Sequence, residues 1–157
     1  MKKRIIIDGV IGTGRESLQE MLCEEYGLSK GTYITFSKGM SHSFYDKELD
    51  LTNIVTVGSF IGDPLYSKLT ETDCLLTEED INLLVNKAKD NKYIIIICLT
   101  TEDKRVKGVN KVVDKNINEI NSYFKLMVKK HDLMLYDPFN ESIVDLLKKL
   151  DRKFEEE

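Results

Sequence analysis

The stretch IIIDGVIGTGRESLQEML, residues 5–22, decides how this chain is expected to fold. Its first residues belong to an apolar, β-branched run, Lys3 to Asp8, which is typical of a buried strand. After a glycine-rich turn, Glu16 to Tyr26 carries apolar residues at helical spacing, and Gly27 is a suitable helix stop. A strand, a glycine turn and a helix in this order are typical of a loop that binds phosphate.

The turn matches the glycine spacing of a phosphate-binding loop. That pattern is a glycine, four residues, a second glycine, a lysine and a hydroxyl residue, and Gly9 and Gly14 hold the two glycine places here. Glycines allow backbone N–H groups to turn inward around a phosphate, and the following helix adds the positive end of its dipole. The predicted phosphate-binding residues are Gly9, Gly12, Thr13, Gly14, Arg15, Glu16 and Ser17.

Two side chains depart from this pattern. Arg15 stands in the place of the lysine. It keeps the positive charge but replaces a compact ammonium with a planar guanidinium. Glu16 stands where the magnesium-binding hydroxyl belongs, and Ser17 lies one position late. Arg15 and Asp8 are the catalytic candidates of this loop, although Asp8 could instead cap or orient it. Glu16 and Ser17 are the candidate metal ligands.

The rest of the chain alternates between strand and helix patterns. Such alternation predicts an α/β fold with a mainly parallel five-stranded sheet and helices on both faces. No internal repeat or domain boundary is evident, so residues 1–157 are expected to form a single domain. Further strands are expected at Thr32–Ser37, Asn53–Gly58, Lys92–Leu99 and Leu133–Tyr136, and helices at Thr77–Lys89, Lys115–Lys130 and Asn140–Phe154.

Composition excludes several classes of protein. The net charge of −4 does not favour binding to DNA or RNA. No apolar stretch approaches the ~20 residues needed to cross a bilayer, so no membrane association is expected. The three cysteines are scattered and odd in number, which favours free thiols in a reducing, cytoplasmic compartment.

Three stretches resemble the thymidylate kinase-like nucleotide kinases, which include the phage deoxynucleoside monophosphate kinases. The first, IIIDGVIGTGRESL, looks like the opening of that family, in which an acidic residue, here Asp8, precedes the loop glycine. The second, GDPLYSKLTETDCLLTEEDINLLVNKAKDNKYIIIICL, is similar to the family's approach to its fourth strand. The third, NINEINSYFKLMVKKHDLMLYD, is similar to a helix that carries a tyrosine, here Tyr123, and to the last strand.

This resemblance implies a three-layer P-loop fold, ATP and Mg²⁺ as cofactors, and transfer of the γ-phosphoryl group to a nucleoside monophosphate. The family's lid corresponds to EDKRVKGVNK, residues 102–111, with Lys104, Arg105 and Lys107 as candidates and Arg105 as the catalytic one. The family's Asp-Arg pair after its third strand is absent, because residues 57–60 read VGSF. Family members are often homodimers.

Other residues have two possible roles each. Lys38, His42 and Tyr45 could bind an acceptor nucleotide or could belong to a solvated connection. Phe60 could stack on a base or pack in the core. In the family, the loop after the last strand often touches the adenine, which makes Phe139 and Asn140 weak candidates.

Three functions follow from these patterns. The first hypothesis is a nucleotide kinase homologue that binds a nucleotide or another phosphorylated ligand, with weak or absent phosphoryl transfer. The second is an active deoxynucleoside monophosphate kinase with rearranged ligands, in which Arg15 replaces the lysine and Ser17 or Glu16 holds magnesium. The third is a kinase fold retained as a scaffold that binds another protein.

Overall fold

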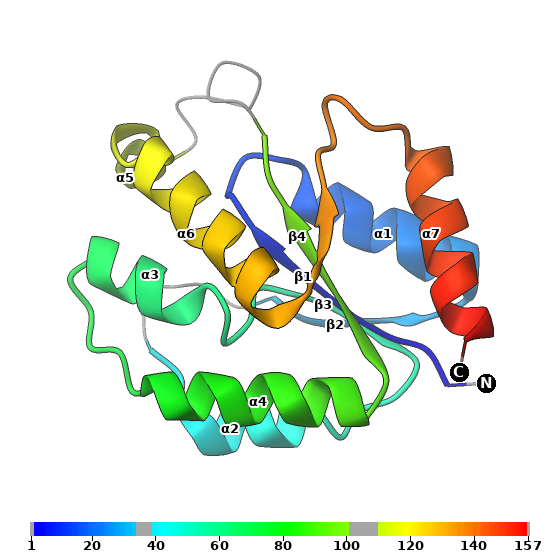
Figure 1. Ribbon diagram of the computed structural model, residues 1–157, viewed down its shortest axis with the longest axis horizontal. Helices are drawn as coiled ribbons and strands as arrows, with labels where there is room; N and C mark the ends of the chain where they lie inside the picture. Colours follow the sequence, from blue (N-terminus) through cyan, green and yellow to red (C-terminus); the bar gives the residue numbers. More distant parts are fainter. Residues whose placement is uncertain (1, 34–38, 101–109, 157) are drawn as a thin grey trace.

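The computed structural model describes residues 2–33, 39–100 and 110–156. At its centre is a five-stranded sheet of order β2-β3-β1-β4-β5, in which every neighbouring pair of strands is parallel (Figure 1). β1 therefore lies in the middle of the sheet, between β3 and β4. The strands are β1 (Arg4–Gly9), β2 (Ser29–Tyr33), β3 (Ile54–Val57), β4 (Tyr93–Cys98) and β5 (Met134–Tyr136).

Helices cover both faces of this sheet, so the fold has three layers (Figure 1). α1 and α7 pack on the face that carries Ile5 and Ile7, whereas α2, α3, α4 and α6 pack on the face that carries Ile6 and Ile95. Because both faces are buried, the central strands read as unbroken apolar runs. The helices are α1 (Arg15–Tyr26), α2 (His42–Glu48), α3 (Asp63–Leu69), α4 (Glu78–Asp90), α5 (Lys111–Lys115), α6 (Ile117–His131) and α7 (Ile143–Glu155).

The second strand differs from its predicted position. The pattern predicts Thr32–Ser37, but β2 already begins at Ser29, and residues 34–38 lie outside the described residues. β2 begins early because Lys30 pairs with Val55 of β3. Pairing with β3 therefore brings Ser29 and Lys30 into the strand, although their composition does not favour it.

Two short helices on the face of the sheet that carries Ile6, α2 and α3, were not expected from the sequence. α2 begins where the Ser41 hydroxyl accepts a hydrogen bond from the Phe44 N–H at 3.2 Å. α3 begins at Asp63 and has Pro64 in its first turn, where proline lacks a donor that the helix would leave unused anyway. Both helices are two turns or less, so their apolar spacing is too brief to form a clear periodic pattern.

The carboxyl ends of β1 and β3 form the crevice in which a functional site is expected. α1 follows β1 on one face of the sheet, whereas α3 follows β3 on the opposite face. Connections that leave in opposite directions open a crevice at the strand ends, where α/β proteins bind ligands. Among the described residues, no helix is both long enough and apolar enough to span a membrane.

Candidate functional site

The glycine loop, residues 9–14, leaves β1 in a conformation that requires glycine. Gly9, Gly12 and Gly14 have φ angles of 116°, 94° and 81°, which side chains of L-residues rarely adopt. The Val10 N–H donates to the Cys98 carbonyl of β4 at 2.9 Å. A Cβ on Gly9 would lie 2.2 Å from that same oxygen. The first residue of the loop is therefore pressed against β4, as a tight turn at the centre of the sheet demands.

Hydrogen bonds from within the loop and from α3 hold its shape. The Thr13 hydroxyl donates to the Val10 carbonyl at 2.6 Å. The Tyr66 hydroxyl donates to the Gly9 carbonyl at 2.7 Å and accepts from the Ile11 N–H at 3.2 Å. These bonds fix the loop before any ligand binds, which reduces the entropy cost of binding.

The loop ends at the N-terminus of α1, which no side chain caps. Gly14 is the N-cap residue, and it provides no side-chain hydrogen bond to the first turn of α1. The N–H groups of a first turn have no partners within the helix, and the helix dipole places positive potential there. The predicted phosphate-binding segment therefore ends in backbone donors suited to an anion.

Arg15 lies beneath the loop and not at its mouth. Its side chain is buried, and its Nη1 lies 3.4 Å from Oδ1 of Asp8, which is fully buried. The structure thus brings together the two catalytic candidates of the loop as an ion pair with each other. The lysine of a phosphate-binding loop reaches the bound phosphate as a point charge, whereas the guanidinium of Arg15 is paired with Asp8.

Asp8 is surrounded by hydrogen-bond donors. Its carboxylate accepts from the Ser59 hydroxyl at 2.6 Å, from the Gly62 N–H at 2.9 Å and from the Gly9 N–H at 2.8 Å. Burial raises the pKa of the Asp8 carboxyl, whereas Arg15 and these three donors act to lower it. Asp8 therefore orients the loop and the segment after β3, and its oxygens are already occupied.

Ser59 is a site residue that the sequence pattern did not single out. It stands where the resembling family carries a charged pair, and it is 3% exposed. Its hydroxyl donates to Asp8 and accepts from the Ile61 N–H at 3.0 Å. The signal was present in the sequence, because a hydroxyl residue following β3 must lie at the same edge of the sheet as Asp8.

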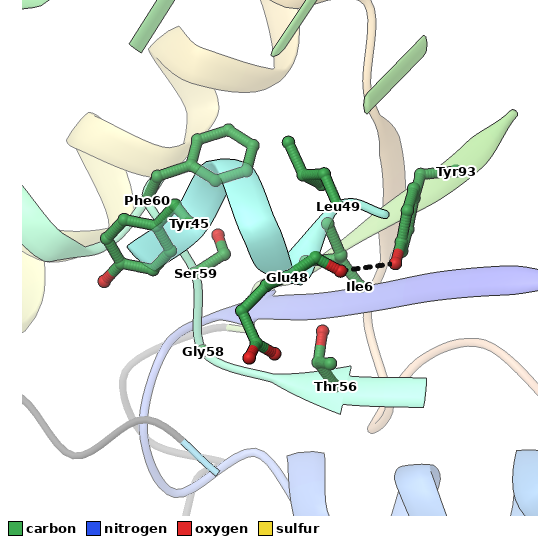
Figure 2. Close-up of a pocket in the computed structure, with 9 residues that line it drawn as sticks. All are labelled: Ile6, Tyr45, Glu48, Leu49, Thr56, Gly58, Ser59, Phe60 and Tyr93. Carbon is green, nitrogen blue, oxygen red and sulfur yellow. Dashed lines mark hydrogen bonds between the residues drawn. The ribbon is translucent and has the colours of Figure 1, made fainter. Parts of the chain in front are cut away.

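The acceptor candidates have different environments. Tyr45 and Phe60 are 2% and 1% exposed, and their rings meet edge to face at 5.8 Å. His42 is half-buried at the start of α2. Figure 2 shows Tyr45 and Phe60 on one side of a small, mainly apolar pocket, with Tyr93 donating to the Glu48 carbonyl on the other. Base stacking by Phe60 remains a prediction that would require its ring to leave the core.

Tyr45 belongs to a second buried cluster, centred on Asp63. The Tyr45 hydroxyl donates to Asp63 at 2.6 Å, and the Ser67 hydroxyl donates to the same carboxylate at 2.9 Å. The Met40 N–H donates to it at 3.3 Å. Burial raises the pKa of Tyr45, so the phenol remains a donor. The cluster ties α2 to α3 at the edge of the crevice.

Replacing Tyr45 with phenylalanine is expected to lower the free energy of unfolding by about 1–3 kcal/mol, because Asp63 would lose a buried donor. Urea denaturation of both proteins measures this difference. Tyr136→Phe is the matched control, since Tyr136 is also buried but its hydroxyl has no hydrogen bond to the described residues. Equal losses for the two variants would contradict the assignment of Tyr45 to this cluster.

The remaining site candidates lie on the surface or outside the described residues. Glu16 and Ser17 are exposed on the first turn of α1. The described residues contain no group of three or more metal-binding side chains. Lys104, Arg105 and Lys107 of the predicted lid lie outside the described residues, as does Lys38.

A cavity of about 360 Å³ opens beside the glycine loop. One wall comes from the loop and α1, and the other from β5 and the connection between β5 and α7. The cavity is adjacent to Phe139 and Asn140, the weak base-binding candidates, although neither of them lines it. Its lining residues are Thr13, Gly14, Ser17, Leu18, Met21, Tyr136, Pro138, Glu141 and Ile143.

Comparison with known proteins identifies the fold. No family model matches the chain, and no curated protein sequence matches it. The YorR protein of Bacillus subtilis, solved in complex with phosphorylated GDP, superimposes with a TM-score of 0.75 at 18% identity over 98% of this chain and 96% of its own.

Two shikimate kinases share the same arrangement at lower similarity. The enzyme from Bacteroides thetaiotaomicron gives a TM-score of 0.55 at 9% identity, and that from Aquifex aeolicus gives 0.56 at 11% identity. Each covers 97% of this chain and 96% of its own. The predicted α/β fold is thereby confirmed: the parallel sheet of order β2-β3-β1-β4-β5 with its helices is the fold of P-loop kinases.

Proposed function

We propose that this protein binds a nucleoside phosphate at the glycine loop and transfers phosphoryl groups weakly or not at all. The observation that carries the proposal is the buried pair of Arg15 and Asp8 beneath a loop whose backbone is shaped for phosphate. The scaffold for binding an anion is retained, while the cation that would neutralise a transferring phosphoryl group is engaged elsewhere.

Three features support a nucleoside phosphate as the ligand. The loop and the uncapped start of α1 offer backbone donors to a phosphate. The adjoining cavity has the volume and the partly apolar lining typical of small-molecule sites. The YorR protein, which has the same fold, was solved with phosphorylated GDP. A thymidylate kinase-like ancestry, inferred from the sequence resemblance, is part of this proposal.

The side chains of the glycine loop and the start of α1 favour weak phosphoryl transfer. Phosphoryl transfer depends almost entirely on positioning and on neutralising charge. Loss of one cation and one metal ligand removes several kcal/mol of transition-state stabilisation, on the order of 10³-fold in rate. Arg15 is paired with Asp8, and Glu16 places a negative charge where a hydroxyl would hold the metal.

The described residues offer more groups to bind the phosphates of ATP than to bind Mg²⁺. The loop backbone can accept its phosphates, but Asp8 is buried and surrounded by donors, so it has no oxygen free for a metal. Ser17 and Glu16 are the only metal ligands proposed from the loop, and they lie in an exposed first turn. Magnesium bound there would be held mainly by the phosphates themselves.

Isothermal titration calorimetry tests this function directly. The ligands are ATP, GDP, dTMP and dUMP, each with and without magnesium, and saturable binding of at least one is expected. A coupled assay for ADP release over the monophosphates then measures transfer. Absence of binding for every ligand would overturn the proposal, and rapid turnover would replace it with the active kinase.

Replacing Glu16 with serine is expected to tighten nucleotide binding by about tenfold at low salt. The change removes a like charge next to the phosphates, an effect worth roughly 1 kcal/mol or more near a protein surface. Glu24→Ser is the matched control, because Glu24 is exposed on the same helix, two turns further along. If both variants bind the nucleotide equally, the phosphate does not lie at the start of α1.

A further inference from the structure

The first two peptide groups of the glycine loop are held on both sides. In the peptide that joins Gly9 to Val10, the carbonyl accepts from the Tyr66 hydroxyl at 2.7 Å, and the N–H donates to a carbonyl of β4 at 2.9 Å. In the next peptide, the Val10 carbonyl accepts from the Thr13 hydroxyl at 2.6 Å. The N–H of that peptide belongs to Ile11 and donates to the same Tyr66 hydroxyl at 3.2 Å. Neither N–H is therefore available to a bound anion.

The following residues of the loop have open donors instead. The backbone N–H groups of residues 12–17 have no hydrogen-bond acceptor among the described residues. Gly12 and Gly14 have positive φ angles, and successive N–H groups in such turns form concave sites for anions. The segment thus consists of an anchored part, residues 9–11, and an open part, residues 12–17, that is suited to a phosphate.

Tyr66 joins both anchored peptides through one oxygen atom. Its hydroxyl donates its hydrogen to the Gly9 carbonyl and accepts from the Ile11 N–H with a lone pair. Loss of the hydroxyl would release both peptides at once. The angle between them sets the direction in which the open part continues, so that direction would no longer be fixed.

The hydroxyl of Tyr66 is presented by a firmly attached helix. Tyr66 is 2% exposed on α3, and its ring centroid lies 6.0 Å from that of Phe124 in α6. The start of α3 is tied to the end of β1, because the Gly62 N–H donates to Asp8 at 2.9 Å. At its first residue, Asp63, α3 is also tied to α2. A group that is fixed in this way can hold the loop in one orientation.

We propose that Tyr66 is a positioning residue for phosphate binding, which acts on the ligand through the glycine loop. Its two hydrogen bonds keep the anchored part in the binding conformation, so the open part presents its donors before the ligand arrives. Without them only a fraction of the molecules would have a competent loop, and the affinity would fall by that fraction. This inference rests on the proposed function, because it names a residue outside the loop on which that binding depends.

Calorimetry with inorganic pyrophosphate tests this role, since pyrophosphate carries phosphate groups without a base or a sugar. Tyr66→Phe removes the hydroxyl but keeps the ring that packs beside Phe124, so the variant is expected to fold. It is expected to bind pyrophosphate and ATP about tenfold more weakly than the unmodified protein, the effect of losing one buried hydrogen bond.

Tyr93→Phe is the matched control. Tyr93 is also buried, and its hydroxyl donates to the Glu48 and Leu51 carbonyls, each at 3.0 Å. Tyr93 is the first residue of β4, whereas Cys98, against which the loop packs, is the last. The control therefore loses tyrosine hydrogen bonds at the far end of the strand, and its affinity for pyrophosphate is expected to stay within about twofold.

Amide hydrogen exchange of the ligand-free protein measures the loop itself. In Tyr66→Phe the Ile11 amide is expected to exchange about tenfold faster, because it loses its acceptor and the loop opens more readily. A residue that only stabilised the whole fold would instead change the slowest amides of β1 and β4. In Tyr93→Phe the exchange of the Ile11 amide is expected to be unchanged.

The outcomes distinguish this inference from the function beneath it. Equal pyrophosphate affinity of Tyr66→Phe and the unmodified protein would overturn the positioning role and leave nucleotide binding intact. Equal losses for Tyr66→Phe and Tyr93→Phe, or unchanged exchange at Ile11 in Tyr66→Phe, would do the same. If the unmodified protein binds neither pyrophosphate nor ATP, the proposed function is overturned and this inference with it.

Discussion

Replacing Asp8 with alanine is expected to lower the free energy of unfolding by about 3–5 kcal/mol. The substitution would leave the guanidinium of Arg15 buried without a counter-charge, and removing one partner of a buried ion pair is far more costly than removing both. It would also leave the Ser59 hydroxyl and the Gly62 N–H without their acceptor. Urea denaturation, monitored by circular dichroism, measures the loss.

A double variant identifies the cause of that loss. Asp8→Leu combined with Arg15→Met removes both charges, and it is expected to be more stable than Asp8→Ala alone because no unpaired charge remains. Glu119→Ala is the surface control, since Glu119 pairs with Lys68 in solvent and should cost less than about 1 kcal/mol. A small loss for Asp8→Ala, similar to that of the control, would contradict the buried pair.

The same double variant bears on the role of Arg15 in binding. If the loop backbone holds the phosphate, then removing Arg15 together with Asp8 should weaken nucleotide binding by less than about tenfold. If Arg15 instead contacts the phosphate directly, the loss should be much larger, because hydrogen bonds to charged groups contribute about 1.5–3 kcal/mol each. Calorimetry on the folded double variant distinguishes these cases.

Local patterns were sufficient to predict the architecture. The β-branched run before Gly9 and the helical spacing after it identified the central unit, because both signals depend on neighbours in sequence. Alternation of strands with helices then implied a parallel sheet. The position of β2 was less predictable, since the pairing of Lys30 with Val55 decides it and that contact spans distant parts of the chain.

The site was predicted in outline only. The glycine loop follows from spacing, but the burial of Arg15 depends on Asp8, Ser59 and Gly62, which converge only in the folded chain. The sequence shows that Arg15 carries a positive charge, but it does not show in which direction the side chain points. The cavity beside the loop could not be predicted for a similar reason, because elements that are distant in the sequence form its walls.

Replacing Gly9 with alanine is expected to lower the free energy of unfolding by about 3–5 kcal/mol, through strain and overpacking together. At a φ of 116° an added Cβ is strained in itself, and it would lie 2.2 Å from the carbonyl oxygen and 2.6 Å from the nitrogen of Cys98. Both atoms belong to the backbone of β4 at the centre of the sheet, so neither can move aside without breaking strand pairing. Thermal and urea unfolding of the variant measure the effect.

Gly27→Ala is the matched control for this substitution. Gly27 also has a positive φ, of 64°, but nothing lies within 4 Å of its added Cβ. Gly27→Ala should therefore lower the free energy of unfolding only through backbone strain, by roughly 1 kcal/mol. The difference between the two variants isolates the contact between the loop and β4. If Gly9→Ala is no more destabilising than Gly27→Ala, the loop is free to move away from the strand, and it cannot hold a fixed phosphate cradle.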